Sequence, residues 1–348
     1  MTAPGRLEVG VVGAGRVGAV LGRALAEAGH RVRAVSAISQ ASRDRAEALL
    51  PGVPVRDVPD VVTGADLVLL AVPDDALAGL VAGLAEVGAW TAGQIVVHTA
   101  GRFGTGVLAP VRAVGALPLA IHPAMTFTGT SLDLTRLVGC SFAVTAPEPV
   151  LPIGQALVVE LGGEPVMLAE EARGLYHAAL AHGANHLVVL VAQAAQALAA
   201  AGVPDPGRML TPLLEAALDG ALRAASGADG TGAISALTGP VRRGDAGTVR
   251  EHEEALTAFA AASGAVDVVT GYRALARAAT VRALAAGQVD ASAAAALLDA
   301  TGPLPGPDAA GPGPAGMPGG AGSLNDEGAG PGEGPDDDAG GPGREEDA

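Results

Sequence analysis

Lysine is missing from this sequence: all 21 of its basic residues are arginine. Its absence excludes Schiff-base chemistry, a P-loop lysine and a lysine general acid. Aromatic residues make up only 2% of the chain, so we expect helices that pack closely through small side chains. The single cysteine, Cys140, excludes an internal disulfide and is typical of a reducing cytoplasm.

Basic residues are also few: 21 arginines stand against 37 acidic residues, which gives a formal net charge of −16. Partners such as nucleic acids and anionic membranes require basic patches, so we expect neither. The first residues lack the basic and apolar regions of a signal peptide. No apolar stretch of about 20 residues is free of interruptions, so no transmembrane span is predicted. We therefore expect a soluble cytoplasmic protein.

Short β-branched runs alternate with alanine-rich helical stretches over residues 1–147. Nearly continuous apolar strands separated by helices indicate a parallel sheet that is covered on both faces. The pattern predicts a Rossmann-type doubly wound α/β domain. Its strands are expected at residues 7–13, 30–36, 65–73, 93–101, 116–123 and 140–146.

The pattern changes after Pro147. One strand-like piece at 164–168 precedes helical segments expected at 169–201, 207–226, 246–263 and 265–287. Residues 148–300 are therefore predicted to form an all-helical domain for substrate binding and dimerisation. Residues 301–348 consist mostly of Gly, Pro, Ala and acidic residues, a composition that predicts a disordered acidic tail with no role in chemistry.

A glycine motif, Gly13-x-Gly15-x-x-Gly18, lies between the first expected strand and a helix. Gly13 permits a tight turn, Gly15 lets the backbone approach a pyrophosphate, and Gly18 allows close packing of helix on strand. The helix N-terminus then offers free N–H groups to phosphates. A purely structural turn is the alternative. The motif predicts dinucleotide binding by Gly13, Ala14, Gly15, Arg16, Val17 and Gly18.

The end of the second strand distinguishes the two nicotinamide cofactors. NAD sites usually place Asp or Glu there to bind the ribose 2′-hydroxyl, but this sequence has no acid before Asp44. A 2′-phosphate could bind Ser36, Ser39 and Arg43, with Arg33 or Arg45 as substitutes; an ordinary solvated loop is the alternative. The sequence therefore favours NADP (NADPH).

Later strand ends carry further candidates, because ligands of open α/β sheets lie across the carboxyl ends of the strands. Near the nicotinamide we expect Val72, Pro73, Asp74, His98, Thr99 and Gly101. His98 could equally be a structural histidine. His122, held by Pro123, is expected to face the same crevice.

The segment "LYHAALAHGANHLVVLV" (175–191) places three histidines and one asparagine in an apolar helix. At about 100° per residue, Asn185 lies between His177 and His182 on one face, and His186 lies roughly opposite His177. Core histidines bonded to carbonyls are the alternative to a catalytic role. His182 and His186 have a spacing used by zinc, but no third ligand is evident, so no metal is predicted.

The segment "ALTGPVRRGDAGTVREH" (236–252) is the last candidate. Its turn and its two arginines could clamp a substrate carboxylate, although an exposed loop at a helix start is an equal alternative. The predicted substrate-binding residues are Thr238, Gly239, Pro240, Arg242 and Arg243.

The order of the motifs VVGAGRVG, LLAVPDDAL, VVHTAG, IHPAMTFTG, YHAALAHGANHLV and LTGPVRRGD resembles one bacterial family. Its members combine a Rossmann-like domain with DUF2520, and they are similar to pyrroline-5-carboxylate reductases and β-hydroxyacid dehydrogenases. The resemblance covers residues 6 to 287 and implies an NAD(P)-dependent oxidoreductase, with ketopantoate as a candidate substrate. β-Hydroxyacid dehydrogenases present Lys-x-x-Asn where this chain has His182-Gly-Ala-Asn185, so their lysine mechanism does not transfer.

Histidine can replace that lysine as a general acid. We expect His177, His182 or His122 to protonate the substrate and Asn185 to orient it. The leading hypothesis is an NADPH-dependent reductase of a C=O in a small carboxylate. The alternatives are an imine reductase of the pyrroline-5-carboxylate type and a non-catalytic NADP-binding protein. The apolar face of residues 187–202 predicts a homodimer, as in relatives of this superfamily.

Overall fold

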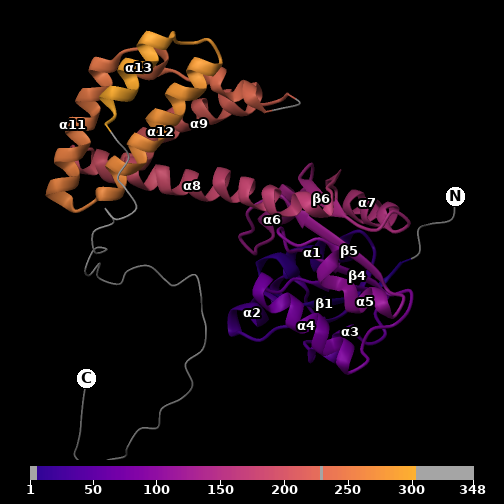
Figure 1. The fold of residues 1–348 in the computed structure, drawn as a ribbon. Helices are drawn as coiled ribbons and strands as arrows, with labels where there is room; N and C mark the ends of the chain where they lie inside the picture. The colour runs from indigo at the N-terminus through magenta and orange to yellow at the C-terminus, as the bar shows by residue number, and fades with distance from the viewer. Residues whose placement is uncertain (1–5, 228–229, 303–348) are drawn as a thin grey trace, which may run out of the picture. The chain divides into compact units, whose positions relative to one another are not determined.

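The computed structural model describes residues 6–227 and 230–302. They belong to two compact units that divide between Ala192 and Gln193, here called the sheet unit and the helical unit (Figure 1). Apart from Thr301 and Gly302, the predicted acidic tail lies outside the described residues.

Seven strands form one sheet in the order β2-β1-β3-β4-β5-β6-β7. Each occurs where the sequence predicts a strand, which confirms the α/β fold class. The last pairing but one, β5 with β6, is antiparallel, and all others are parallel. This reversal was not predicted, because an apolar strand pattern is the same in both directions. The strands are β1 Glu8–Val12, β2 Arg31–Ser36, β3 Leu67–Leu70, β4 Ile95–His98, β5 Leu117–Pro123, β6 Ser141–Thr145 and β7 Glu164–Met167.

Helices cover both faces of the sheet because its strands are apolar on both sides. One face packs against α1 (Arg16–Glu27), α2 (Gln40–Leu49), α6 (Leu132–Leu137) and α7 (Leu151–Glu160). The other packs against α3 (Val58–Val62), α4 (Asp74–Glu86), the short 3-10 helix η1 (Thr105–Leu108) and α5 (Ala109–Ala113). β1 lies between β2 and β3, so β2 is added on one side of β1 and β3 on the other. Ligands of such sheets bind beside the strand at which the order changes in this way.

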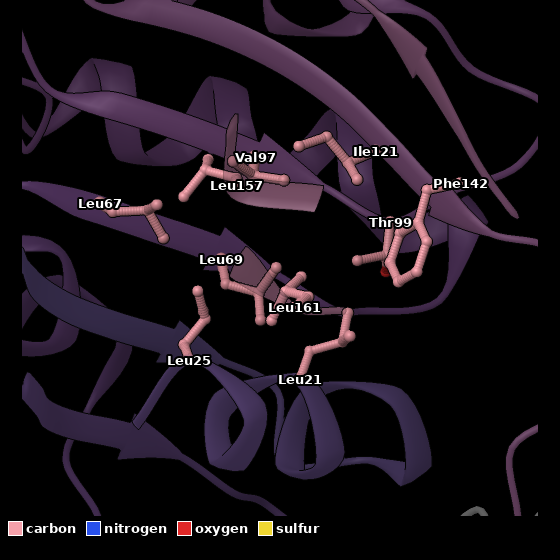
Figure 2. A pocket seen from close by; sticks show the side chains of 10 residues that line it. All are labelled: Leu21, Leu25, Leu67, Leu69, Val97, Thr99, Ile121, Phe142, Leu157 and Leu161. Carbon is pink, nitrogen blue, oxygen red and sulfur yellow. The ribbon is translucent and has the colours of Figure 1, made fainter. Parts of the chain in front are cut away.

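A small apolar cavity lies within the first of these faces (Figure 2). Aliphatic side chains line most of it, and Phe142 contributes its only aromatic ring. The lining residues are Leu21, Leu25, Leu67, Leu69, Val97, Thr99, Ile121, Phe142, Leu157 and Leu161.

The 3-10 helix η2 (Glu170–Ala172) leads into α8 (Arg173–Ala200), which contains the division between the units. The helical unit continues with α9 (Pro206–Ala224), η3 (Thr231–Ala236), α10 (Gly239–Arg243), α11 (Ala246–Ser263), α12 (Val266–Ala285) and α13 (Ala291–Ala300). The helical character predicted for this part is confirmed. The sequence analysis missed α10 and α13; α10 has only five residues, and the alanines of α13 give no clear apolar periodicity.

One stretch of the described chain, Glu170–Ala200, is long and apolar enough to cross a membrane by length and composition alone. The sequence analysis predicted no such stretch. Its first turn is bonded to the sheet, because the Arg173 guanidinium donates to the carbonyls of Ala120 and Ala143.

Candidate functional site

The glycine loop between β1 and α1 has the geometry that a dinucleotide requires. Gly13 has a φ of +95°, and a Cβ there would lie 2.5 Å from the carbonyl oxygen of Ala71. A Cβ on Gly18 would collide with the carbonyl oxygen of Gly13. In contrast, no other group lies within 4 Å of the position that a Cβ on Gly15 would take. Two glycines therefore serve packing, and the third faces open space.

The N-terminus of α1 is uncapped. Gly15 is its N-cap residue, no side chain accepts from its first turn, and no acid lies in that turn. Ser36 holds the loop in front of it, since its hydroxyl accepts from the Gly13 N–H at 2.9 Å and its carbonyl from the Ala14 N–H at 2.8 Å. Free N–H groups and the helix dipole favour an anion here. The residues present therefore fit a pyrophosphate.

The residues after β2 form the predicted corner for the 2′-phosphate. Ser39 caps α2, because its side chain accepts from the Ser42 N–H. Arg43 is exposed, whereas Arg33 donates to the carbonyl of Thr63. Asp44 accepts a hydrogen bond from Gln40 at 2.7 Å. The Arg43 side chain thus has no hydrogen-bond or ion-pair partner in the described part of the chain, and the adjacent acid, Asp44, is engaged.

Two further arginines meet at the loop after β5. A Cβ on Gly129 would lie 2.9 Å from Cγ of Arg16 and 3.1 Å from Nε of Arg45. Neither arginine forms a hydrogen bond or an ion pair with a described residue. The fully buried carboxylate of Asp133 holds the loop by accepting from the N–H groups of Thr128 and Gly129. Two arginine side chains without partners among the described residues therefore lie against the loop that follows β5.

The segment after β3 contacts the glycine loop. Cγ1 of Val72 would be 3.4 Å from a Cβ on Gly13, and Pro73 is the N-cap residue of α4. Asp74 begins that helix and forms an ion pair with Arg102 at 3.1 Å. Of the residues after β4, Thr99 directs its side chain into the apolar cavity of Figure 2.

His98, the last residue of β4, is completely buried. Its Nε2 lies 2.8 Å from the carbonyl oxygen of Gly104, and its Nδ1 accepts from the Ala100 N–H. Burial lowers its pKa to about 4, against smaller opposing effects, so the ring is neutral at pH 7. Both ring nitrogens are occupied by backbone groups, and the residue shapes the loop that follows β4.

His122 and His177 come together beside Gly101. Their ring centroids are 6.5 Å apart, and a Cβ on Gly101 would lie 2.7 Å from Cδ2 of His177 and 3.0 Å from Nε2 of His122. Nδ1 of His122 is 2.8 Å from the hydroxyl of Tyr176. Burial, followed by the positive charge of Arg173, lowers the pKa of His122 to about 4. His122 is therefore neutral at pH 7 and is not an imidazolium acid.

Arg173 lies behind this cluster and is 1% exposed. Its guanidinium donates to the carbonyls of Ala120 and Ala143 and to the hydroxyl of Thr145. Nη1 has no partner among the described residues. Glu170 accepts instead from Thr105 and Gly106. The site therefore contains a buried cation with no carboxylate bonded to it.

The remaining predicted residues of α8 lie apart from this cluster. His182 and His186 are exposed and bonded to each other, with 2.8 Å between their Nδ1 atoms. Asn185 is exposed as well. The sequence analysis grouped His177, His182 and Asn185 on one face; within the sheet unit only His177 contacts the strand ends.

The predicted carboxylate clamp belongs to the helical unit. Thr238 is the N-cap residue of α10, Gly239 has a φ of +82°, and Pro240 follows it. Arg242 donates to the carbonyl of Gln288 at 2.9 Å, and with Arg243 it lines an open pocket.

The sequence analysis missed Arg173 and Tyr176. Both precede His177 within one helical turn, so the 3.6-residue period could have placed Arg173, Tyr176 and His177 near one face. The sequence gives no sign that Arg173 is buried, because arginine is mostly exposed in folded proteins.

The comparisons with known proteins agree with this architecture. Residues 2–123 match the family model of the Rossmann-like domain, and residues 140–279 match that of a domain of unknown function, DUF2520. No curated protein matches the sequence.

Solved structures share the fold at low sequence identity. A candidate NADP oxidoreductase from Bacteroides fragilis is 20% identical, with a TM-score of 0.60, and the match covers 79% of this chain and 98% of that one. A protein from Thermotoga maritima is 19% identical, with a TM-score of 0.57, and the match covers 80% of this chain and 99% of that one. An imine reductase from Pseudomonas sp. is 18% identical, with a TM-score of 0.57, and the match covers 86% of this chain and 100% of that one.

These matches cover the sheet with its glycine loop and most of the helices that follow it. The chain therefore combines a Rossmann-like domain at residues 2–123 with a DUF2520 domain at residues 140–279.

Proposed function

We propose that the protein is an NADPH-dependent reductase that acts on a C=O group of a small carboxylate. One observation carries the proposal: the glycine loop follows the carboxyl end of β1, and His122, which His177 contacts, lies at the carboxyl end of β5 in the parallel part of the same sheet. Ligands of such sheets bind at this edge.

The spacing of the strands suits a dinucleotide. The glycine loop follows β1, and His122 lies on β5, three strands away in the sheet. At about 4.8 Å per strand the separation is about 14 Å, so an extended dinucleotide with its pyrophosphate at Gly15 would lie across these strand ends. NADPH would supply the hydride when bound, and the chain would orient the substrate and supply a proton.

Preference for NADPH follows from the charge after β2. Arg43 and Arg45 follow β2, and Arg16, at the start of α1, lies with Arg45 beside Gly129. None of the three side chains has a partner among the described residues, whereas Asp44 is engaged by Gln40. A carboxylate that could bind a 2′-hydroxyl is missing from the end of β2. The serines act indirectly: Ser36 supports the glycine loop and Ser39 caps α2.

His122 and His177 are the two histidines that we place nearest the reacting atom, and one of them would supply the single proton that the reduction needs. Arg242 and Arg243, which line a pocket of the helical unit, stay a separate prediction for binding a carboxylate. Ketopantoate remains the named candidate for this substrate class.

Imine reduction is the second candidate. The match to the imine reductase from Pseudomonas sp. covers 100% of that protein and 86% of this chain. The same hydride geometry serves a C=N bond, and the two reactions differ in the basicity of the atom to be protonated.

NADPH consumption should be measured with the purified protein on a panel of 2-oxo acids and cyclic imines. Turnover of an oxo acid is the expected result. Turnover of cyclic imines alone would assign the second candidate, and NADPH binding without any turnover would identify a non-catalytic NADP-binding protein.

Two histidine variants test the catalytic assignment. His177→Ala should lower turnover by about 10² to 10⁴-fold without changing the affinity for NADPH. His182→Ala should lower turnover to a similar extent only if the exposed part of α8 joins the site during the reaction. Unchanged turnover in both variants would leave His122 as the remaining histidine donor.

A further inference from the structure

A tyrosine–histidine pair joins the first turns of α8 to the end of β5. The hydroxyl of Tyr176 is 2.8 Å from Nδ1 of His122. Their rings meet edge to face, with centroids 5.6 Å apart and an interplanar angle of 87°. Both side chains are half-buried, so the hydrogen bond is partly shielded from water.

The charges around the pair determine which atom carries the proton. His122 faces the positive charge of Arg173 and the rings of His98 and His177, while the carboxylate of Glu170 is bonded to Thr105 and Gly106. A second positive charge on His122 is therefore unfavourable. Burial raises the pKa of Tyr176, and Arg173 opposes this effect. Both groups are consequently neutral near pH 7.

Between a neutral tyrosine and a neutral histidine the hydrogen bond can run in either direction, and the phenol is the more acidic donor. Donation from the phenol to Nδ1 is therefore favoured, and it places the ring proton of His122 on Nε2. That atom faces Gly101 and the ring of His177: a Cβ on Gly101 would be only 3.0 Å from it. The N–H of His122 is thus directed to the edge of the sheet where the substrate is proposed to bind.

We propose that Tyr176, His122 and Arg173 form a proton relay for the reduction, an inference that rests on the proposed function. When the carbonyl carbon accepts the hydride that bound NADPH would supply, the carbonyl oxygen would take the Nε2 proton of His122. Nδ1 takes the phenolic proton of Tyr176 in the same step, so His122 stays neutral. The tyrosinate that remains is stabilised by the buried guanidinium of Arg173 and regains a proton from water.

An NMR measurement that does not depend on turnover tests which ring nitrogen of His122 carries the proton. In the full-length protein with ¹⁵N-labelled histidine, NMR should show His122 as the neutral Nε2–H tautomer from pH 6 to pH 8. Tyr176→Phe should redistribute the ring proton between the two nitrogens. Tyr272→Phe is the matched control, because its hydroxyl also lies beside a histidine nitrogen, 3.1 Å from Nδ1 of His252. An Nδ1–H tautomer in the unmodified protein would overturn the proposal.

Turnover tests the relay separately. Tyr176→Phe and His122→Gln should each lower kcat by about 10²-fold or more and leave the affinity for NADPH unchanged. Because the two groups act as one unit, the double variant should be no slower than His122→Gln alone. Multiplicative losses, or full kcat in folded Tyr176→Phe, would overturn the relay. A wild-type protein that turns over no substrate in the panel would contradict the proposed function, and the tautomer would still decide the arrangement.

Discussion

At the scale of single residues, the glycines of the first loop have different physical roles. Gly15 faces open space, whereas Gly18 is in contact with the carbonyl of Gly13. We expect Gly15→Ala to keep its melting temperature and to weaken NADPH binding strongly, because the added methyl occupies the space of the pyrophosphate. Gly18→Ala should lose thermal stability, because the helix must move away from the strand.

Thermal denaturation and calorimetric titration with NADPH separate these two effects. A Gly15→Ala protein that binds NADPH normally would contradict the placement of the pyrophosphate.

The arginines after β2 lead to a prediction about cofactor choice. Charge-assisted hydrogen bonds contribute about 1.5–3 kcal/mol each, so Arg43→Glu and Arg45→Glu should each weaken NADPH binding by about 10 to 100-fold. NADH, which lacks the 2′-phosphate, should be affected much less.

Fluorescence titration with both cofactors measures the difference. Arg112→Glu on α5 makes the same change of charge at an exposed position and serves as the control. Equal losses for NADPH and NADH in the Arg43 and Arg45 variants would refute this 2′-phosphate site.

At the scale of elements, the buried histidines of β4 and β5 make stability dependent on pH. The pKa values of His98 and His122 are lowered to about 4 in the folded protein, against about 6.5 in an unfolded chain. Between these values the unfolded state binds more protons, so the free energy of unfolding must fall as the pH falls from 6.5 to 4. The loss is at most about 1.4 kcal/mol per pH unit for each histidine.

Urea denaturation at pH 7 and pH 4.5 measures this loss. His122→Gln should reduce the difference between the two conditions, whereas His252→Gln, at an exposed position of α11, should not. An identical difference in all three proteins would contradict the burial of a neutral His122.

At the scale of the whole molecule, the apolar part of α8 indicates an assembly. Val188 and Val189 are 69% and 50% exposed, and Leu187 and Leu190 accompany them. Monomers rarely leave such a continuous apolar surface open to water. We propose that a second copy of the chain covers it and expect a homodimer.

Light scattering at micromolar concentration should give twice the monomer mass, and Val188→Glu should give monomers. Val87→Glu is the control, because Val87 has the same 69% exposure at the end of α4. A monomeric wild-type protein would refute the proposal.

Local patterns in the sequence determined the elements. The apolar strand runs predicted all seven strands, and Gly13-x-Gly15-x-x-Gly18 predicted the loop, because strand alternation and glycine conformation depend on near neighbours. The longer helices after residue 168 were predicted for the same reason. The antiparallel direction of β6 was not, since it depends on how the chain returns to the sheet.

Only the tertiary structure decided which polar groups meet. His122 and His177 are 55 positions apart in the sequence, yet they share the space beside Gly101. Arg173 is 1% exposed because strands β5 and β6 enclose it, and its charge then lowers the pKa of His122. Such shifts arise from burial and from charges brought together by folding. The sequence therefore determined which chemical groups are available, and the fold selected those that lie together and set their protonation.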